Sequence, residues 1–208
     1  MEIRLENISF AYGDKVVLDN LSVSFEGGAI NCITGPSGCG KSTLLDILAG
    51  ISKPSCGTLG GLEGRSLAIS FQEPRLLPWK SVLDNVAFGL DDALDAQQRR
   101  ARAGRWLDFV GLSGSDSLMP AQLSGGMAQR VSLARALAPE ADILLLDEPF
   151  SAVDEALKTT LMSSLAALWA EKGTTVIMVS HNTREINFLQ KSLPFKKIVL
   201  TLQPLKKG

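Results

Sequence analysis

Eight consecutive residues restrict the fold of this chain more than any other feature. Residues 35–42 read Gly-Pro-Ser-Gly-Cys-Gly-Lys-Ser, so two glycines enclose four residues and the second glycine precedes lysine and serine. In such a loop the glycines let backbone N–H groups turn inward around phosphate oxygens, provided that a strand precedes the loop and a helix follows it. Residues 29–34 are mostly apolar, and after Lys41 apolar residues recur at helical spacing until Gly50 and Pro54, which suit a helix end. This context favours a phosphate-binding loop over an ordinary glycine-rich turn.

The loop supplies candidate ligands for a nucleotide and its metal ion. Lys41 would place a positive charge at the β and γ phosphates, and the hydroxyl of Ser42 would ligate Mg²⁺. Because Cys39 lies beside Lys41 and a helix N-terminus, which both favour a thiolate, we expect maleimide to label this cysteine and bound ATP to shield it. The residues predicted to bind the nucleotide here are Gly35, Pro36, Ser37, Gly38, Cys39, Gly40, Lys41, Ser42 and Thr43.

Other segments extend the pattern to alternating strands and helices. Residues 21–25 alternate between apolar and polar, as in a half-buried strand, whereas the short apolar runs 143–146 and 176–179 are typical of parallel strands covered on both faces. Between these runs, acidic residues at the start and Lys-Gly at the end predict one helix over about 154–173. Residues 74–121 contain several prolines and look like a helical insertion. We therefore expect a doubly wound α/β core.

Composition and charge exclude several classes of protein. The chain has 208 residues, 45% of them hydrophobic, which is enough to bury a core. The net charge of −1 supplies no long-range attraction to nucleic acid, so we expect no nucleic-acid partner. No apolar run approaches the roughly 18 residues that a membrane span needs, and residues 1–6 lack the pattern of a signal peptide, so we expect a cytoplasmic protein. Three cysteines without C-x-x-C spacing fit reduced thiols better than disulfides or zinc.

Two adjacent carboxylates follow the apolar run 143–146. Asp147 and Glu148 would therefore lie at the carboxyl end of a central strand, where α/β sheets bind ligands. There Asp147 would hold Mg²⁺ through its water shell, and Glu148 would orient or deprotonate an attacking water. An acidic pair at the start of a helix is the alternative, and the phosphate loop makes that alternative weaker.

A third motif indicates which kind of nucleotide-binding protein this is. Residues 123–130 read Leu-Ser-Gly-Gly-Met-Ala-Gln-Arg, in which Ser124 is a good helix N-cap and the N–H groups of Gly125 and Gly126 could bind an anion. Alone, this segment could be only a helix cap. Together with the phosphate loop and the acidic pair it resembles the ATP-binding cassette (ABC) family, whose signature has glutamine where this chain has Met127.

The resemblance extends over most of the chain and implies a fold. The fold class is α/β, with a P-loop NTPase (RecA-like) core, an N-terminal antiparallel β subdomain and an inserted α-helical subdomain. Residues 1–208 would form a single ABC ATPase domain, and about 74–135 would be the helical subdomain that carries the signature. Residues 50–72 are few for this family and rich in glycine, which leaves open whether the antiparallel subdomain keeps all its strands.

The resemblance also assigns roles to four further residues. Tyr12 is similar to the aromatic residue that stacks on adenine, although it could be a core tyrosine of a strand. Gln72 is similar to the glutamine that contacts Mg²⁺ and couples the core to the helical insertion. Asp154 lies in a loop that resembles the one crossing the dimer interface, and it could also start a helix. His181, the only histidine, matches the switch histidine that contacts the γ-phosphate and helps to hold Glu148, although a lone histidine is often structural.

The loop after Gln72 suggests what the ATPase serves. Residues 73–79 contain two prolines and the apolar Leu76, Leu77 and Trp79, a patch suited to receive a helix of a membrane partner unless it packs inside the insertion. This stretch resembles ATPase subunits of bacterial importers for nitrate, sulfonates and taurine.

The function that we predict is an ATP-hydrolysing subunit of a bacterial ABC importer that uses ATP and Mg²⁺. It would pair with a second ATPase subunit, most simply a second copy, so that each phosphate loop faces the signature of the other. It would bind transmembrane permease subunits at the inner face of the membrane and serve a periplasmic or lipoprotein solute-binding protein indirectly. The alternatives are a non-transport ABC ATPase, which would share the motor, and an ATP-dependent scaffold without turnover, against which Glu148 argues.

Overall fold

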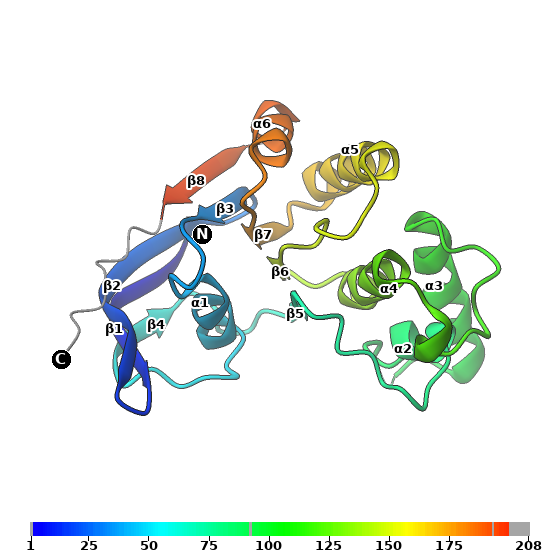
Figure 1. Cartoon of the computed structure of the whole chain (residues 1–208), viewed down its shortest axis with the longest axis horizontal. Helices are drawn as coiled ribbons and strands as arrows, with labels where there is room; N and C mark the ends of the chain where they lie inside the picture. The colour runs from blue at the N-terminus through cyan, green and yellow to red at the C-terminus, as the bar shows by residue number, and fades with distance from the viewer. Residues whose placement is uncertain (1, 92, 193, 200–208) are drawn as a thin grey trace.

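A computed structural model describes residues 2–91, 93–192 and 194–199, and it contains two sheets (Figure 1). The larger sheet is parallel and has the strand order β5-β6-β7-β3-β8. Its strands are β3 (Ile30–Thr34), β5 (Leu67–Ser70), β6 (Ile143–Asp147), β7 (Thr175–Val179) and β8 (Phe195–Val199). Every residue of β6 and β7 is buried, which confirms that the two apolar runs are covered on both faces.

The smaller sheet is antiparallel and has the order β2-β1-β4. Its strands are β1 (Glu2–Tyr12), β2 (Lys15–Glu26) and β4 (Cys56–Gly60). The glycine-rich segment 50–72 therefore supplies one antiparallel strand, β4, before it enters the parallel sheet as β5. Gly57 within this strand and Gly61 directly after it have positive φ, and a Cβ on either would approach the β1 backbone to 2.5 or 2.4 Å, respectively. Because glycine has no Cβ, the chain can lie close to β1 at these two positions.

The helices are α1 (Lys41–Leu48), α2 (Val82–Ala87), α3 (Ala96–Phe109), α4 (Gly125–Leu137), α5 (Glu155–Lys172) and α6 (Thr183–Ser192), with a 3₁₀ turn η1 at Pro120–Gln122. The predicted helix ends are confirmed. Gly50 follows α1 at φ 70°, and α5 begins after an Asp154 side chain that accepts the Leu157 N–H and ends at Gly173 with φ 64°.

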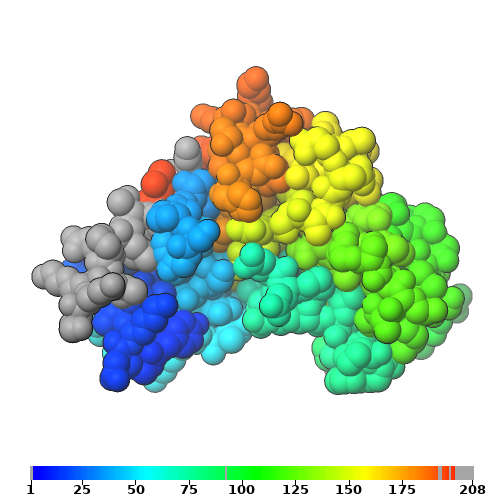
Figure 2. Space-filling view, viewed as in Figure 1, coloured from blue at the N-terminus to red at the C-terminus, as the bar shows by residue number. Residues whose placement is uncertain are grey.

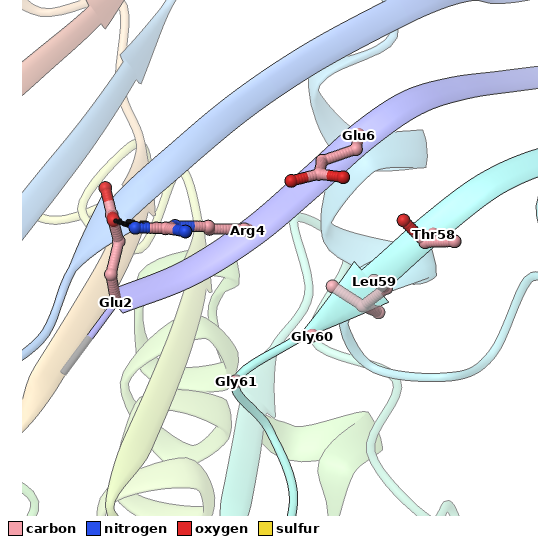
Figure 3. Close-up of a pocket in the computed structure, with 7 residues that line it drawn as sticks. All are labelled: Glu2, Arg4, Glu6, Thr58, Leu59, Gly60 and Gly61. Carbon is pink, nitrogen blue, oxygen red and sulfur yellow. Dashed lines mark hydrogen bonds and ion pairs between the residues drawn. The ribbon is translucent and has the colours of Figure 1, made fainter.

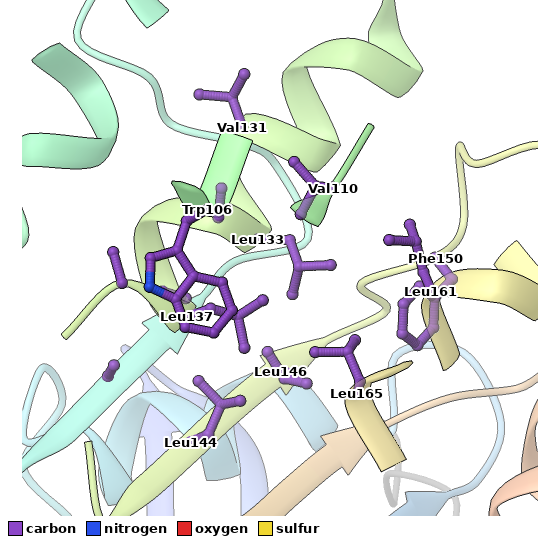
Figure 4. Packing of buried hydrophobic residues seen from close by; sticks show 14 of the residues in the cluster. Trp106, Val110, Val131, Leu133, Leu137, Leu144, Leu146, Phe150, Leu161 and Leu165 are labelled. Atoms are coloured by element: carbon purple, nitrogen blue, oxygen red, sulfur yellow. The ribbon is translucent and has the colours of Figure 1, made fainter. Parts of the chain in front are cut away.

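The two faces of the parallel sheet pack against different partners. Along β6, Ile143 and Leu145 belong to a core shared with α1 and the antiparallel sheet, while Leu144 and Leu146 belong to a core shared with α4, α5 and α6. This is the period of two that a strand imposes on its side chains. Figure 4 shows the second core, in which Trp106 of α3 and other helical residues lie over β6. The helices after β5 are thus joined to the sheet by a continuous apolar core.

The space-filling view shows how these parts form the outline of the molecule. The N-terminal antiparallel sheet and the helices α2 to α4 form two lobes at opposite ends, and the surface is hollowed between them (Figure 2). Within the described ranges, no helix combines the length and the apolar character that crossing a membrane requires.

Candidate active site

Three neighbouring strands end at the same level and bring the predicted motifs together. In the parallel register, Val179 at the end of β7 lies opposite Ile33 of β3 on one side and Asp147 of β6 on the other. The phosphate loop follows β3, Glu148 follows β6 and His181 follows β7. The carboxyl edge of the sheet, the usual ligand site of such sheets, therefore carries all three segments.

The phosphate loop enters α1 through a glycine that this geometry requires. Gly40 is the N-cap of α1 at φ 88°, and no side chain caps the helix there. A Cβ at Gly40 would lie 2.9 Å from Leu18 Cδ2 and 3.0 Å from Val17 Cγ1, so a larger residue would clash as well as be strained. The N–H groups at the start of α1 thus lack a side-chain acceptor, which suits them to bind an anion.

Lys41 places a positive charge inside this loop. The residue is only 9% exposed, and its Nζ donates hydrogen bonds to the carbonyl oxygens of Gly35 at 3.0 Å and Pro36 at 2.8 Å. These carbonyls hold the ammonium group under the loop backbone. A phosphate entering the loop would meet a cation that has already been removed from bulk water. The Coulomb attraction between the two is stronger in this less polar environment than in water.

The structure contradicts the accessibility expected for Cys39. This residue is 3% exposed and belongs to the core beneath α1, while its Sγ lies 3.9 Å from Lys41 Nζ. The loop contributes its backbone to the ligand side and turns the Cys39 side chain into the apolar interior. Of the three cysteines, Cys56 is exposed and Cys32 is buried.

We therefore expect maleimide to modify Cys56 alone in the folded protein, at a rate that MgATP does not change. Burial keeps a reagent from Cys32 and Cys39 until the fold opens. Mass spectrometry of the intact chain after a short exposure would count one adduct in the wild type and none in Cys56→Ser. Rapid labelling of Cys39 in Cys56→Ser would show that the loop opens in solution.

Asp147 lies in an unfavourable environment for a carboxylate. Burial raises its pKa most, and the nearby carboxylates Glu148 and Asp46 raise the pKa further, whereas a hydrogen bond from Ser42 and the charge of Lys41 lower it. Asp46 follows Ser42 by one helical turn on α1, and its own pKa is raised by burial. Asp46 is not among the residues predicted for the site, although its spacing i, i+4 on a predicted helix places it on the same face as Ser42.

These residues fit Mg²⁺. Hydroxyl and carboxylate oxygens are the ligands that Mg²⁺ prefers, and a cation would relieve the repulsion between Asp147 and its neighbouring carboxylates. The described part of the chain contains no cage of three or more carboxylate, thiol or imidazole groups that could hold a metal ion by themselves. Mg²⁺ commonly keeps several waters and uses one or two protein ligands together with substrate phosphates, as Ser42 and Asp147 would allow.

Asp147→Asn should stabilise the fold near neutral pH while it removes the ligand. Because the pKa of Asp147 is raised in the native state, the unfolded chain loses this proton at a lower pH than the native state does. As pH rises, ionisation of Asp147 therefore lowers the free energy of unfolding. The amide removes this cost, and we expect a melting temperature higher by up to about 4 °C, the shift that roughly 1 kcal/mol gives in a domain of this size. The gain should vanish below about pH 4, where the aspartate is protonated in both states. Calorimetry against pH checks this, and a lower melting temperature for Asp147→Asn at neutral pH would contradict the assignment.

Glu148 and His181 form a direct contact between two of the strand ends. His181 Nδ1 lies 2.9 Å from Glu148 Oε1, and the side chains are 68% and 16% exposed, respectively. The backbone of Glu148 is in the left-handed region at φ 48°, while its N–H donates to Val179 O at 3.1 Å. Such a conformation is costly for a residue with a Cβ and persists where surrounding contacts impose it, often at functional sites. The contact that the resemblance implied between these two residues is therefore present.

The signature segment contacts the loop before α5 within the same chain. Ser124 caps α4 by accepting the Met127 N–H at 3.2 Å, as the sequence predicted. A Cβ on Gly126 would lie 2.4 Å from the carbonyl oxygen of Ala152, so only glycine fits. Arg130 lies near enough to Asp154 for that charge to raise the Arg130 pKa, against the stronger lowering by burial. The signature and the segment around Asp154 thus form one surface, while Gly125 is exposed at its edge.

The two remaining predicted ligands lie at the margins of the site. Gln72 is exposed two residues beyond β5, and Arg135 of α4 donates to the carbonyls of Pro74 at 2.7 Å and Arg75 at 3.0 Å in the loop that follows it. Tyr12 is 54% exposed at the end of β1, where its ring meets the Phe10 ring edge-on at 4.8 Å. It is therefore not a core tyrosine. Among the hydrogen bonds, ion pairs and ring contacts of the described residues, none joins Gln72 or Tyr12 to the phosphate loop.

A cavity elsewhere on the surface does not belong to this site. It has a volume of about 380 Å³ and lies over β1 and β4, lined by Glu2, Arg4, Glu6, Thr58, Leu59, Gly60 and Gly61 (Figure 3). Of its three charged side chains, Arg4 and Glu2 are paired, with Arg4 Nη2 2.8 Å from Glu2 Oε2. None of its lining residues comes from the phosphate loop or from the other strand ends described above.

Comparisons with known proteins agree with this geometry. The ABC transporter family matches residues 18–151. The chain is 43% identical over 189 residues to the aliphatic sulfonates import ATP-binding protein SsuB 1 of Pseudomonas syringae pv. syringae, an alignment that covers 91% of this chain and 77% of the relative. It is 42% identical over 199 residues to the taurine import ATP-binding protein TauB of Chromobacterium violaceum, covering 90% and 76%.

Two solved structures share the fold over nearly the whole chain. The dimeric bacterial ABC transporter cassette MJ0796 superimposes with a TM-score of 0.84 at 29% identity, covering 99% of each chain. The same cassette in a dimeric post-hydrolysis state with ADP and Pi gives a TM-score of 0.82 at 31% identity, covering 89% of this chain and 90% of the other. The P-loop NTPase fold, with its antiparallel sheet and its inserted helices, is thereby confirmed. The chain belongs to the ABC transporter family and is an ATP-binding and ATP-hydrolysing member of it.

Proposed function

We propose that this chain is the ATP-hydrolysing subunit of a bacterial importer, and that its solute belongs with the sulfonates and taurine named for its relatives. The observation that carries the proposal is that three features lie at one edge of the sheet. The first is the buried Lys41, and the second is the pair formed by Asp147 and Ser42. The third is the contact between Glu148 and His181. A scaffold that binds ATP without turnover needs the first two features and not the third.

Each residue has a separate part in the hydrolysis. Lys41 and the loop backbone bind the phosphates, and Ser42 and Asp147 would hold Mg²⁺ with Gln72, where the ion neutralises phosphate charge. Glu148 accepts a proton from the attacking water, and its contact with His181 fixes where its carboxylate lies. His181 itself is exposed, so its other ring nitrogen is accessible to a terminal phosphate. Tyr12, also exposed, offers its ring to the base.

Two copies of the chain would complete each site. In Figure 1, α1 with the phosphate loop and α4 with the signature lie well apart in one chain. Residues 124–126 therefore suit the phosphates of a nucleotide held by a second copy, as the dimeric form of the similar cassette suggests. ATP would hold the copies together through contacts that exist only in the dimer, and hydrolysis would release them. Asp154 would lie at this interface.

The residues after Gln72 offer a surface for the permease. Trp79 is 71% exposed and Phe88 is 62% exposed, with Lys80 Nζ 5.9 Å from the Phe88 ring. Leu76 differs from the expectation, because it packs against the core, and Leu77 is half-buried. The docking anchor that we propose is therefore the aromatic pair and not the leucines.

A buried asparagine fixes the shape of this loop. Asn85 is fully buried, and its Oδ1 accepts the Leu77 N–H at 2.8 Å while its Nδ2 donates to the carbonyls of Leu77, Lys80 and Ser81 at 3.1, 3.0 and 3.0 Å. The loop thus presents Trp79 without further ordering, which lowers the entropic cost of docking.

Residues 74–135 would act as a helical subdomain that passes permease contacts to the signature. The chain would lie on the inner face of the membrane through the permease, and a solute-binding protein would act from the other side.

Trp79→Ser should weaken assembly with the permease and leave ATP hydrolysis intact. Loss of a central aromatic anchor costs about 2 kcal/mol or more, roughly a 30-fold loss of affinity. The measurement pairs co-purification of a permease of the sulfonate or taurine importer type with phosphate release by the isolated subunit. Ile51→Ser is the matched control, since Ile51 is 55% exposed on a different part of the chain. Full assembly and transport with Trp79→Ser would contradict docking at this loop.

A further inference from the structure

A buried ion pair joins α5 and α6 behind the segment that carries His181. The side chains of Lys158 and Glu185 are only 9% and 6% exposed, and Lys158 Nζ lies 3.2 Å from Glu185 Oε1. Ionised side chains are rarely buried so deeply, and each offsets part of the cost of removing the other from water. Because well-packed apolar residues in such places are often as stable or more stable, stability alone does not account for a lysine and a glutamate here.

The second carboxylate oxygen of Glu185 holds the end of β7. Ser180, which is 2% exposed, donates its hydroxyl to Glu185 Oε2 at 2.7 Å, and the same hydroxyl oxygen accepts the N–H of Asn182 at 3.1 Å. The backbone N–H of Ser180 in turn donates to Ile33 O at 3.3 Å. His181 stands between Ser180 and Asn182, so hydrogen bonds fix the backbone on both sides of it.

The His181 side chain has little packing of its own. It is 68% exposed, and Glu148 Oε1 at 2.9 Å is the partner that the structure gives it. A ring this exposed would lose its direction if the backbone beneath it moved. We propose that Lys158 and Glu185 are positioning residues, which set His181 against Glu148 by fixing Ser180; this rests on the roles proposed above for His181 and Glu148.

The same pair also connects His181 to the interface loop. Lys158 Nζ lies 3.6 Å from Glu155 Oε2 in the first turn of α5, directly after Asp154. A shift of this turn when a second copy docks would therefore act on Lys158 and, through Glu185, on the segment around His181. The network gives the dimer contact a route to the hydrolytic residues that does not pass through the phosphate loop.

Ser180→Ala and the double variant Lys158→Leu/Glu185→Leu test the proposal. Both remove the hydroxyl-to-carboxylate anchor, and the double variant leaves no buried charge unpaired, so its fold should survive. We expect kcat for ATP to fall about 10- to 100-fold, as small misplacements of catalytic groups do, while the KM for ATP changes less than about twofold because the phosphate loop is untouched. A purely structural ion pair would instead give a double variant with full kcat once it is folded.

Two further variants make the outcomes distinguishable. Arg184→Ala is the matched control, because Arg184 precedes Glu185 on α6 with an 85% exposed side chain and a surface contact of 4.0 Å to Glu155, and its kcat should equal that of the wild type. His181→Ala should lose turnover. If His181→Ala keeps full kcat, the role proposed for His181 fails. If His181→Ala is inactive while Ser180→Ala and the folded double variant keep full kcat, the proposed function stands and the positioning network is overturned.

Discussion

Glu148→Gln should slow phosphate release by about 10²- to 10⁴-fold, the usual contribution of a positioned general base. The substitution keeps the size of the side chain and an oxygen for the contact with His181, and it removes the group that can accept a proton. Binding should persist, because Lys41 and the phosphate loop are unchanged. With hydrolysis stopped, ATP should keep two copies together, and sedimentation should report a dimer with ATP and a monomer without it.

The control for this variant is a glutamate that takes no part in the site. Glu171 is exposed on α5, and Glu171→Gln makes the same chemical change in open solvent. We expect it to release phosphate at the rate of the wild type. Turnover by Glu148→Gln at the wild-type rate would remove Glu148 from the mechanism, whatever its geometry.

Lys41→Ala should strongly weaken ATP binding, so it acts one step earlier than Glu148→Gln. Truncating a buried charge that pairs with phosphate costs about 2–5 kcal/mol, which is roughly a 30- to 5,000-fold increase in the dissociation constant. The carbonyls of Gly35 and Pro36 also lose the donor that holds the loop in shape. Titration of a fluorescent ATP analogue measures the loss, and circular dichroism verifies the fold.

The exposed Lys53 gives a matched control, since Lys53→Ala removes the same charge from the surface. Its dissociation constant should stay within about twofold of the wild-type value, because surface charges are well screened. If Lys41→Ala bound ATP as tightly as the wild type, the ammonium group under the loop would be a structural support and not a phosphate ligand.

The parts that could be predicted from the sequence depend on local signals. Gly50 and Gly173 end their helices because a position at positive φ favours glycine, and Ser124 and Asp154 begin theirs because their oxygens accept backbone N–H groups. Continuous apolar runs predicted β6 and β7 for an equally local reason, since a strand covered on both faces has no polar side. The position of Asp147 and Glu148 at a strand end followed directly.

The parts that could not be predicted depend on which way a side chain turns and on contacts between distant segments. A phosphate loop motif specifies backbone geometry, and nothing in it reveals that Cys39 faces the core beneath α1. A proline-bounded apolar loop likewise does not show that Leu76 packs inward while Trp79 stays exposed. Asn85 has no motif at all, because its four hydrogen bonds go to backbone groups whose positions only the folded loop defines.

Specific ATPase activity measured against protein concentration tests most directly whether two copies build each active site. If the signature of one copy serves the nucleotide of the other, phosphate release per chain should be low at concentrations where sedimentation shows monomers, and it should rise as dimers form with MgATP. Constant activity per chain across that range, including dilutions at which every chain is a monomer, would contradict a site shared between two copies.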